Sequence, residues 1–217
     1  MIKLVTANMP AEEFDTKANT TVFLAGPITF APDWQSEFVK GLREYQEKHE
    51  EYKNYNITVY SPRWVLDPEG ETIPFNYKRQ YDWETFHIQA ADIIVFGFVP
   101  YAEEPKLDRS YARTTRIELG EAIGRNNALR EYQEDMPYDQ SIFVYKDKNY
   151  TDDKDGYIEL KVSSNKFIWT DNWERIYSAI IQKCIYNIED FANLRLRVRG
   201  LDSCDYYAKY AMQGEEE

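Results

Sequence analysis

The run from Asp92 to Val99 (DIIVFGFV) constrains the fold more than any other stretch of the sequence. It is short, almost wholly apolar and rich in β-branched and aromatic residues, which is typical of a strand buried on both faces. It is also far shorter than the roughly 18 apolar residues that a membrane-spanning helix needs. Such a strand requires cover on both sides of its sheet, so we expect it near the centre of an α/β fold.

Strand and helix patterns alternate along the rest of the chain. Further strands are predicted at 21–25, 57–60, 141–145 and 167–169. Helices are predicted to begin at Asp33, Asn76, Thr115, and Asp171 or Asn172. This alternation predicts a parallel sheet of five strands with helices on both faces. The expected strand order is 2-1-3-4-5, in which the chain reverses direction between the first and third strands.

The 217 residues are predicted to form one domain, residues 1–217, with a core at about 21–190. Residues 1–19 lack sustained periodicity and are expected to form a loosely ordered arm. The segment 63–75 contains prolines and a glycine and is predicted to be a lid or specificity loop. Residues 146–166 are interpreted as a surface hairpin, and 213–217 as a loosely ordered acidic tail.

Composition narrows the classes of function. Lysine and arginine total 26 against 38 aspartates and glutamates, a net charge of -12, which argues against a broad surface for a nucleic acid polymer. No apolar run approaches the length of a membrane helix, so we expect no membrane partner. Cys184 and Cys204 have no metal-binding spacing and are predicted to be reduced thiols. A cytoplasmic protein is therefore expected.

The stretch from Ala112 to Arg125 joins the buried strand to a helix and is predicted to place Glu118 in the first helical turn. One interpretation is a capping box, in which Glu118 reaches back to the backbone N–H of Thr115. The other is a nucleophile or base that the helix N-terminus holds ionised. The loops that leave the first and third strands should converge at the switch point of the sheet, which favours the second interpretation.

Several other residues near this junction are candidates for the site. Gly26-Pro27 ends the first strand, where a glycine would let the backbone approach a ligand closely. Asp82 and Glu84 are candidates for a second carboxylate, because glycosidic chemistry generally uses a pair. His87 fits a structural role better than a catalytic one. Asp92 is a candidate for substrate binding, although a structural cap is the simpler role.

Three motifs together resemble the nucleoside 2-deoxyribosyltransferase family and its N-glycosidase relatives. They are Phe-Leu-Ala-Gly-Pro at 23–27, Trp83-Glu84 followed by the 91–96 run, and Arg116-x-Glu118-x-Gly120-x-Ala122. The resemblance covers roughly residues 21–145. It implies a flavodoxin-like three-layer sandwich, which agrees with the predicted strand order.

The resemblance also implies roles for particular residues. Glu118 matches the glutamate that attacks the anomeric carbon of a deoxynucleoside, and Glu84, or Asp82, matches the acid that handles the leaving base or sugar. The turn of Ala25, Gly26 and Pro27 would lie beneath the sugar. The 5′-phosphate of a nucleotide substrate would be bound by Thr114, Thr115 and Arg116, and the base or phosphate would face Arg63.

Three functional hypotheses follow. The first is transfer of a deoxyribosyl group from a nucleoside or nucleotide to another free nucleobase. The second is hydrolysis of deoxynucleoside 5′-monophosphates at the same glutamate. The third is a non-catalytic nucleotide-binding module. The resemblance implies a homo-oligomer, and because a deoxyribosyl group ionises easily, we expect neither a cofactor nor a metal ion.

Overall fold

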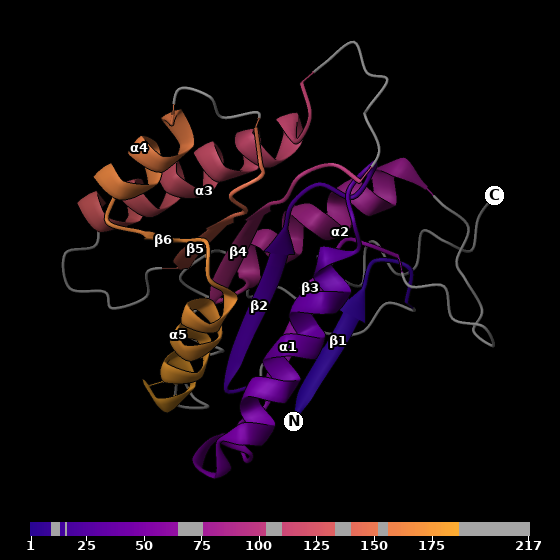
Figure 1. The fold of residues 1–217 in the computed structure, drawn as a ribbon, viewed down its shortest axis with the longest axis vertical. Helices are drawn as coiled ribbons and strands as arrows, with labels where there is room; N and C mark the ends of the chain where they lie inside the picture. The colour runs from indigo at the N-terminus through magenta and orange to yellow at the C-terminus, as the bar shows by residue number, and fades with distance from the viewer. Residues whose placement is uncertain are drawn as a thin grey trace.

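The computed structural model describes residues 1–9, 14–15, 17–64, 76–102, 110–132, 140–151 and 156–186. Its centre is a six-stranded parallel sheet in the order β1-β3-β2-β4-β5-β6 (Figure 1). The strands are β1 (Ile2–Thr6), β2 (Thr20–Ala25), β3 (Ile57–Ser61), β4 (Ile93–Phe98), β5 (Ser141–Lys146) and β6 (Ile168–Thr170).

The five predicted strands are confirmed to within one residue at each end, and so is their order. Strands β2 to β6 stand in the order β3-β2-β4-β5-β6, which is the predicted 2-1-3-4-5. Strand β4, the run that anchored the prediction, is buried along its whole length and pairs with β2 and β5. The α/β class and the parallel sheet therefore follow from the burial of short apolar strands.

The prediction of an unstructured arm at the N-terminus was wrong for the first residues. Ile2–Thr6 form β1, which pairs in parallel with β3 from Ile2 opposite Ile57 to Thr6 opposite Ser61. This strand lies at the edge of the sheet, and Lys3 is exposed. An edge strand buries only part of its surface, which explains why its sequence lacks the continuous apolar run of a central strand.

Helices cover both faces of the sheet (Figure 1). One face packs against α1 (Trp34–Lys48) and α5 (Trp173–Tyr186). The other packs against α2 (Tyr77–Ala90), α3 (Arg113–Tyr132) and α4 (Tyr157–Ser164). A short 3-10 helix, η1 (Glu50–Tyr52), follows α1. The three-layer sandwich expected from the sequence is therefore confirmed.

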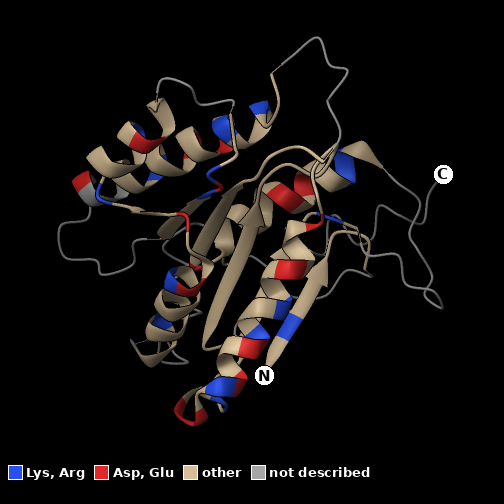
Figure 2. Ribbon diagram, in the orientation of Figure 1, with Lys and Arg blue, Asp and Glu red and all other residues tan. Residues whose placement is uncertain are grey.

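Helix α1 begins where the sequence predicts. The Asp33 carboxylate accepts a hydrogen bond from the Ser36 N–H at 3.2 Å, so Asp33 is the N-cap. Trp34, Phe38 and Leu42 are buried against the sheet. Charged side chains of both signs lie along the outer side of the helix (Figure 2). Its amphipathic pattern therefore determines which face packs on the sheet.

The predicted surface hairpin at 146–166 is also corrected. Tyr157–Ser164 form the helix α4, which buries Ile158 and Val162 and leaves Leu160 67% exposed. Apolar residues at 158, 160 and 162 alternate as in a strand, whereas 158 and 162 alone have helical spacing. A run this short fits both periods, which is why the sequence did not distinguish them. The predicted lid at 65–75, Cys204 and the 213–217 tail lie outside the described residues.

Candidate active site

The loops after β2 and β4 meet at the carboxyl end of the sheet, as the predicted strand order requires. Strands β2 and β4 are neighbours, with Ala25 opposite Phe96. The Ala102 N–H, beyond β4, donates a hydrogen bond to the Phe30 carbonyl, beyond β2, at 2.7 Å. The sequence-distant segments therefore converge at the switch point, where open α/β folds bind small molecules.

Glu118 does not lie in the first turn of its helix, so this prediction was wrong. Helix α3 begins at Arg113, after Ala112 with a positive φ of 53°. Thr115 is the third residue of the helix and is buried, so it is not an N-cap, and the capping box does not form. Glu118 lies in the second turn, beyond the orphan N–H groups of the helix end.

The Glu118 carboxyl is partly buried, and among the described residues it has no hydrogen-bond or ion-pair partner. Burial raises its pKa to about 7, with repulsion from Glu84 and Glu121 adding to the effect. The helix N-terminus therefore does not hold this group ionised at low pH, contrary to the interpretation from sequence. A carboxyl withdrawn from water without a partner requires an explanation, and function is the usual one.

Glu84 supplies the neighbouring carboxyl, from α2. Its Oε1 accepts a hydrogen bond from the Gln80 side chain at 2.5 Å, and burial raises its pKa. Gln80 also donates to the Pro62 carbonyl at 3.0 Å and accepts from the Trp64 indole at 2.9 Å. Gln80 therefore fixes Glu84 relative to the segment that follows β3.

Asp82, the alternative second carboxylate, does not share this environment. It pairs with Lys78 at 2.6 Å, one turn earlier on α2. Two residues on a helix are about 200° apart, so Asp82 and Glu84 point to opposite sides of α2. Glu84, and not Asp82, acts on the Glu118 carboxyl. The structure thus brings Glu84 and Glu118 together.

The glycine of the Ala25-Gly26-Pro27 turn is required by packing. A Cβ at Gly26 would lie 2.5 Å from the Trp34 ring and 2.8 Å from the Gly97 carbonyl oxygen. The Trp34 indole also donates to the Pro27 carbonyl at 3.1 Å. This close approach of Trp34 accounts for the glycine, so the close approach of a ligand, expected from the sequence, is not needed to explain it.

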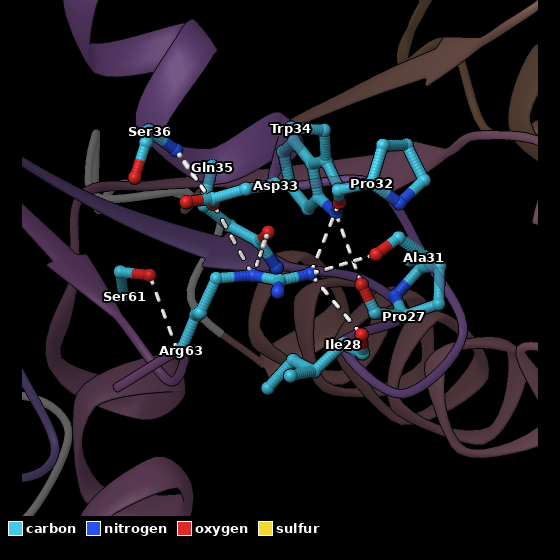
Figure 3. A network of polar contacts seen from close by, with 10 residues as sticks. All are labelled: Pro27, Ile28, Ala31, Pro32, Asp33, Trp34, Gln35, Ser36, Ser61 and Arg63. Carbon is cyan, nitrogen blue, oxygen red and sulfur yellow. Dashed lines mark hydrogen bonds and ion pairs between the residues drawn. The ribbon is translucent and has the colours of Figure 1, made fainter. Parts of the chain in front are cut away.

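Arg63 is engaged by the protein itself (Figure 3). Its Nη2 donates to the carbonyls of Ile28 at 3.1 Å and Pro32 at 3.0 Å, and its Nε donates to Gln35 Oε1 at 2.9 Å. The guanidinium also pairs with Asp33 at 3.3 Å. The sequence predicted that Arg63 faces a base or phosphate. In the structure it holds the loop after β2 against the end of β3.

Asp92 and His87 have structural partners. Asp92 Oδ2 accepts hydrogen bonds from the N–H and hydroxyl of Thr21 at 2.8 and 2.9 Å, next to the amino ends of β2 and β4. His87 is 1% exposed, and its Nδ1 lies 2.8 Å from the Trp83 carbonyl. Burial lowers the pKa of His87 to about 3, so the ring is neutral. The structural role expected for His87 is confirmed.

The first residues of α3 divide between solvent and the neighbouring loop. Thr114 is exposed and Thr115 is buried. Arg116 donates to the hydroxyls of Ser110 at 3.2 Å and Tyr150 at 2.7 Å. Arg116 precedes Glu118 by two positions, so the two side chains leave the helix about 200° apart. The phosphate-binding role of these residues stays a prediction.

A pocket of about 190 Å³ lies beside Arg116, and sequence reasoning missed it. It is lined by Pro100, Tyr101, Tyr111, Asn149, Tyr150 and Thr151. The chain's 18 tyrosines suggested a surface for planar ligands without indicating which ones form it. The available signal was position, since these residues follow β4 and β5, whose carboxyl ends are adjacent.

Two searches of the described residues bear on cofactors and membranes. Across these ranges, no group of three or more histidine, cysteine, aspartate or glutamate side chains could hold a metal ion. Among the helices of these same ranges, none combines the length and the hydropathy of a membrane span.

Comparison with solved structures found two distant similarities. A conserved protein from Enterococcus faecalis V583 is 14% identical, with 76% of this chain and 98% of that chain covered and a TM-score of 0.42. The flavodoxin, WrbA-like protein from Agrobacterium tumefaciens is 12% identical, with coverage of 78% and 99% and a TM-score of 0.35. No curated protein matched the chain.

A family comparison gave a much closer assignment. The sequence model of the family described as "Nucleoside 2-deoxyribosyltransferase like" matches residues 19–135, more than half of the 217 residues. The matched segment runs from just before β2 to just beyond α3, so it includes both Glu84 and Glu118. The chain therefore belongs to the nucleoside 2-deoxyribosyltransferase-like family.

Proposed function

We propose that this protein cleaves the N-glycosidic bond of a 2′-deoxynucleoside or nucleotide and transfers the deoxyribosyl group to another nucleobase. The observation that carries the proposal is the unpartnered, partly buried carboxyl of Glu118 beside Glu84, near the carboxyl end of β4 among the described residues. Membership of the family supports a nucleoside or nucleobase as the substrate class.

The protonation of the two carboxyls suits this reaction. Burial raises the pKa of both groups, and their mutual repulsion opposes ionisation of both together. Near neutral pH the pair therefore holds about one proton. Cleavage of an N-glycosidic bond needs one carboxylate to attack carbon and one acid to protonate the departing base. The pair can supply both forms at once.

In the first step, a carboxylate oxygen of Glu118 bonds to the anomeric carbon as the bond to the base nitrogen breaks. The electron pair of that bond goes to the base nitrogen, which takes the proton of Glu84. In the second step, a nitrogen of the incoming base attacks the anomeric carbon and displaces Glu118, while Glu84 accepts the proton that this nitrogen loses. Both carboxyls return to their starting states.

The experiment is chromatography of reactions that contain the purified protein and a panel of deoxynucleosides and their monophosphates. Each reaction is run with and without a second free base. Glu118→Gln is compared with Glu159→Gln, a control at an exposed position on α4. New nucleoside that requires the second base, and that the Glu118→Gln variant does not form, is the expected result.

Other outcomes of the same experiment decide against transfer. Free base released equally with and without an acceptor would show hydrolysis by the same pair of carboxyls. No turnover of any substrate by wild-type protein, with substrate binding unchanged in Glu118→Gln, would show a binding module. Equal turnover by wild type and Glu118→Gln would remove Glu118 from the mechanism.

A further inference from the structure

The pocket beside Arg116 has a buried aromatic floor and a polar, exposed rim. Tyr111 and Tyr150 form the floor, and each is 4% exposed. Tyr101, Asn149 and Thr151 form the rim, where Tyr101 is 39% exposed. A ligand entering the pocket would therefore contact ring surfaces below and hydrogen-bonding groups around the opening.

Ring contacts hold the pocket in shape. Tyr150 meets Phe98 of β4 edge to face, with ring centres 5.4 Å apart. The Tyr111 ring lies 6.3 Å from Tyr150 and 5.6 Å from Tyr101, in the second case at an angle of 85°. Edge-to-face contacts of this kind are favourable. The aromatic part of the pocket is thus anchored to the central strand of the sheet.

Hydrogen bonds fix the loop after β5 in the same way. The Asp147 N–H donates to the Phe98 carbonyl at 2.9 Å, which joins this loop to the end of β4. Asp147 Oδ1 accepts from the Asn149 N–H at 2.8 Å, and its carbonyl accepts from the Tyr150 N–H at 2.9 Å. A site that is already formed loses little entropy when a ligand binds.

The pocket and the carboxyl pair lie on different sides of α3. Arg116 donates to the hydroxyl of Tyr150, in the floor of the pocket, at 2.7 Å. Glu118 leaves the helix about 200° away and interacts with Glu84 on α2. A ligand in the pocket therefore contacts residues that the proposed cleavage does not use.

The dimensions and chemistry of the pocket indicate its ligand. A volume of about 190 Å³ is below the roughly 300–1,000 Å³ of sites for drug-sized molecules, so it suits one small ring system. Tyrosine faces stack on other planar π systems. The amide of Asn149 offers a donor and an acceptor side by side, as the edges of nitrogen heterocycles require. A sugar ring has no π face for such stacking.

We propose that this pocket binds a planar nitrogen heterocycle of the nucleobase class, separately from the Glu84 and Glu118 pair. Stacking on the tyrosines supplies most of the affinity, and Asn149 and Thr151 bond to the edge of the ring. This inference does not require bond cleavage at Glu118, so it goes beyond the proposed function and stands or falls independently of it.

The test is a fluorescence titration of the full-length protein with 2-aminopurine, a fluorescent purine base. Tyr101→Ala and Asn149→Ala change exposed positions at the rim. Tyr77→Ala is the matched control, since Tyr77 is an exposed tyrosine on α2. Tyr101→Ala is expected to weaken binding about tenfold, because loss of one stacking partner typically has an effect of this size. Asn149→Ala should weaken it less, and Tyr77→Ala and Glu118→Gln should leave it unchanged.

Competition identifies the class of ligand. Adenine or cytosine should displace 2-aminopurine, and 2-deoxyribose should not. Unchanged affinity in both Tyr101→Ala and Asn149→Ala would overturn the proposal, as would displacement by 2-deoxyribose or the absence of binding at millimolar 2-aminopurine. Loss of binding in Glu118→Gln would overturn it too, because the base would then bind at the carboxyl pair. An inactive enzyme that retains Tyr101-dependent binding would contradict only the proposed function.

Discussion

Glu84 on α2 acts on Glu118 on α3 by charge repulsion and helps to raise the pKa of the Glu118 carboxyl to about 7. The two residues are 34 positions apart in the sequence, on helices that flank β4 in the chain and cover the same face of the sheet. Their interaction links the fold to the proposed chemistry, because it lets one carboxyl stay protonated while the other ionises.

Replacement of Glu84 by glutamine should lower the pKa of Glu118 below its wild-type value of about 7. The reason is that glutamine keeps the shape of the side chain and removes its negative charge. The measurement is a carbon NMR titration of the glutamate carboxyls. Asp82→Asn, on the opposite side of α2, is the control and should leave the value in place. An unchanged Glu118 pKa in Glu84→Gln would show that the two groups do not interact.

Replacement of Glu118 by glutamine should stabilise the protein at pH 8 and not at pH 4. Burial raises the pKa from 4.5 to about 7, so the folded state binds the proton more tightly than the unfolded state. Stability is therefore lost as pH rises from about 4.5 through about 7. The gain at pH 8 should be on the order of 2 kcal/mol, since one pKa unit corresponds to about 1.4 kcal/mol. Thermal unfolding measures it, and Glu159→Gln should show no such pH dependence.

Replacement of Gly97 by alanine should destabilise the fold by about 1–3 kcal/mol, because a Cβ would lie 2.8 Å from the Trp34 ring. Trp34→Leu, which removes the ring, should make the added alanine far less costly. The same double replacement at Gly26 should rescue less, because a Cβ there also meets the Gly97 carbonyl oxygen at 2.8 Å. Denaturant unfolding of both double-mutant cycles decides the matter. Equal rescue at the two glycines would contradict this packing.

Replacement of Arg63 by alanine should cost about 1–3 kcal/mol and expose the loop after β2 to proteases, because the backbone carbonyls of that loop lose their donor. Arg63→Lys should restore little, since an ammonium cannot reproduce the planar fork. Arg175→Ala, at an exposed position on α5, is the control and should change stability by less than about 0.5 kcal/mol. Limited proteolysis and thermal unfolding report the two effects. Wild-type stability in Arg63→Ala would mean that the network is dispensable.

The central sheet was predictable because its strands leave a strong signal. A strand such as β4, buried on both faces, must be apolar throughout. The edge strand β1 carries an exposed Lys3, and the short helix α4 fits two periodicities, so both were missed. The sequence thus predicts elements well where burial is complete and poorly where a short element is only partly covered.

The candidate site was predictable only in part. The motif around Glu118 and the position of Glu84 identified the carboxyl pair. The start of α3 was misplaced by two residues, because Thr115 is a favourable N-cap in sequence while the chain turns into the helix at Ala112. The role of Arg63 had no sequence signal, because its main partners are backbone carbonyls, which every residue carries.

The most direct test of the central claim is mass spectrometry of the protein after turnover with a deoxynucleoside substrate is stopped by acid. The account predicts a peptide that contains Glu118 and is heavier by one deoxyribosyl group, lost when a second base is added before the acid. Glu118→Gln should carry no such group, and Glu159→Gln should carry as much as wild type. Base exchange by a wild-type protein that never carries the sugar on Glu118, or that carries it on another residue, would contradict the account.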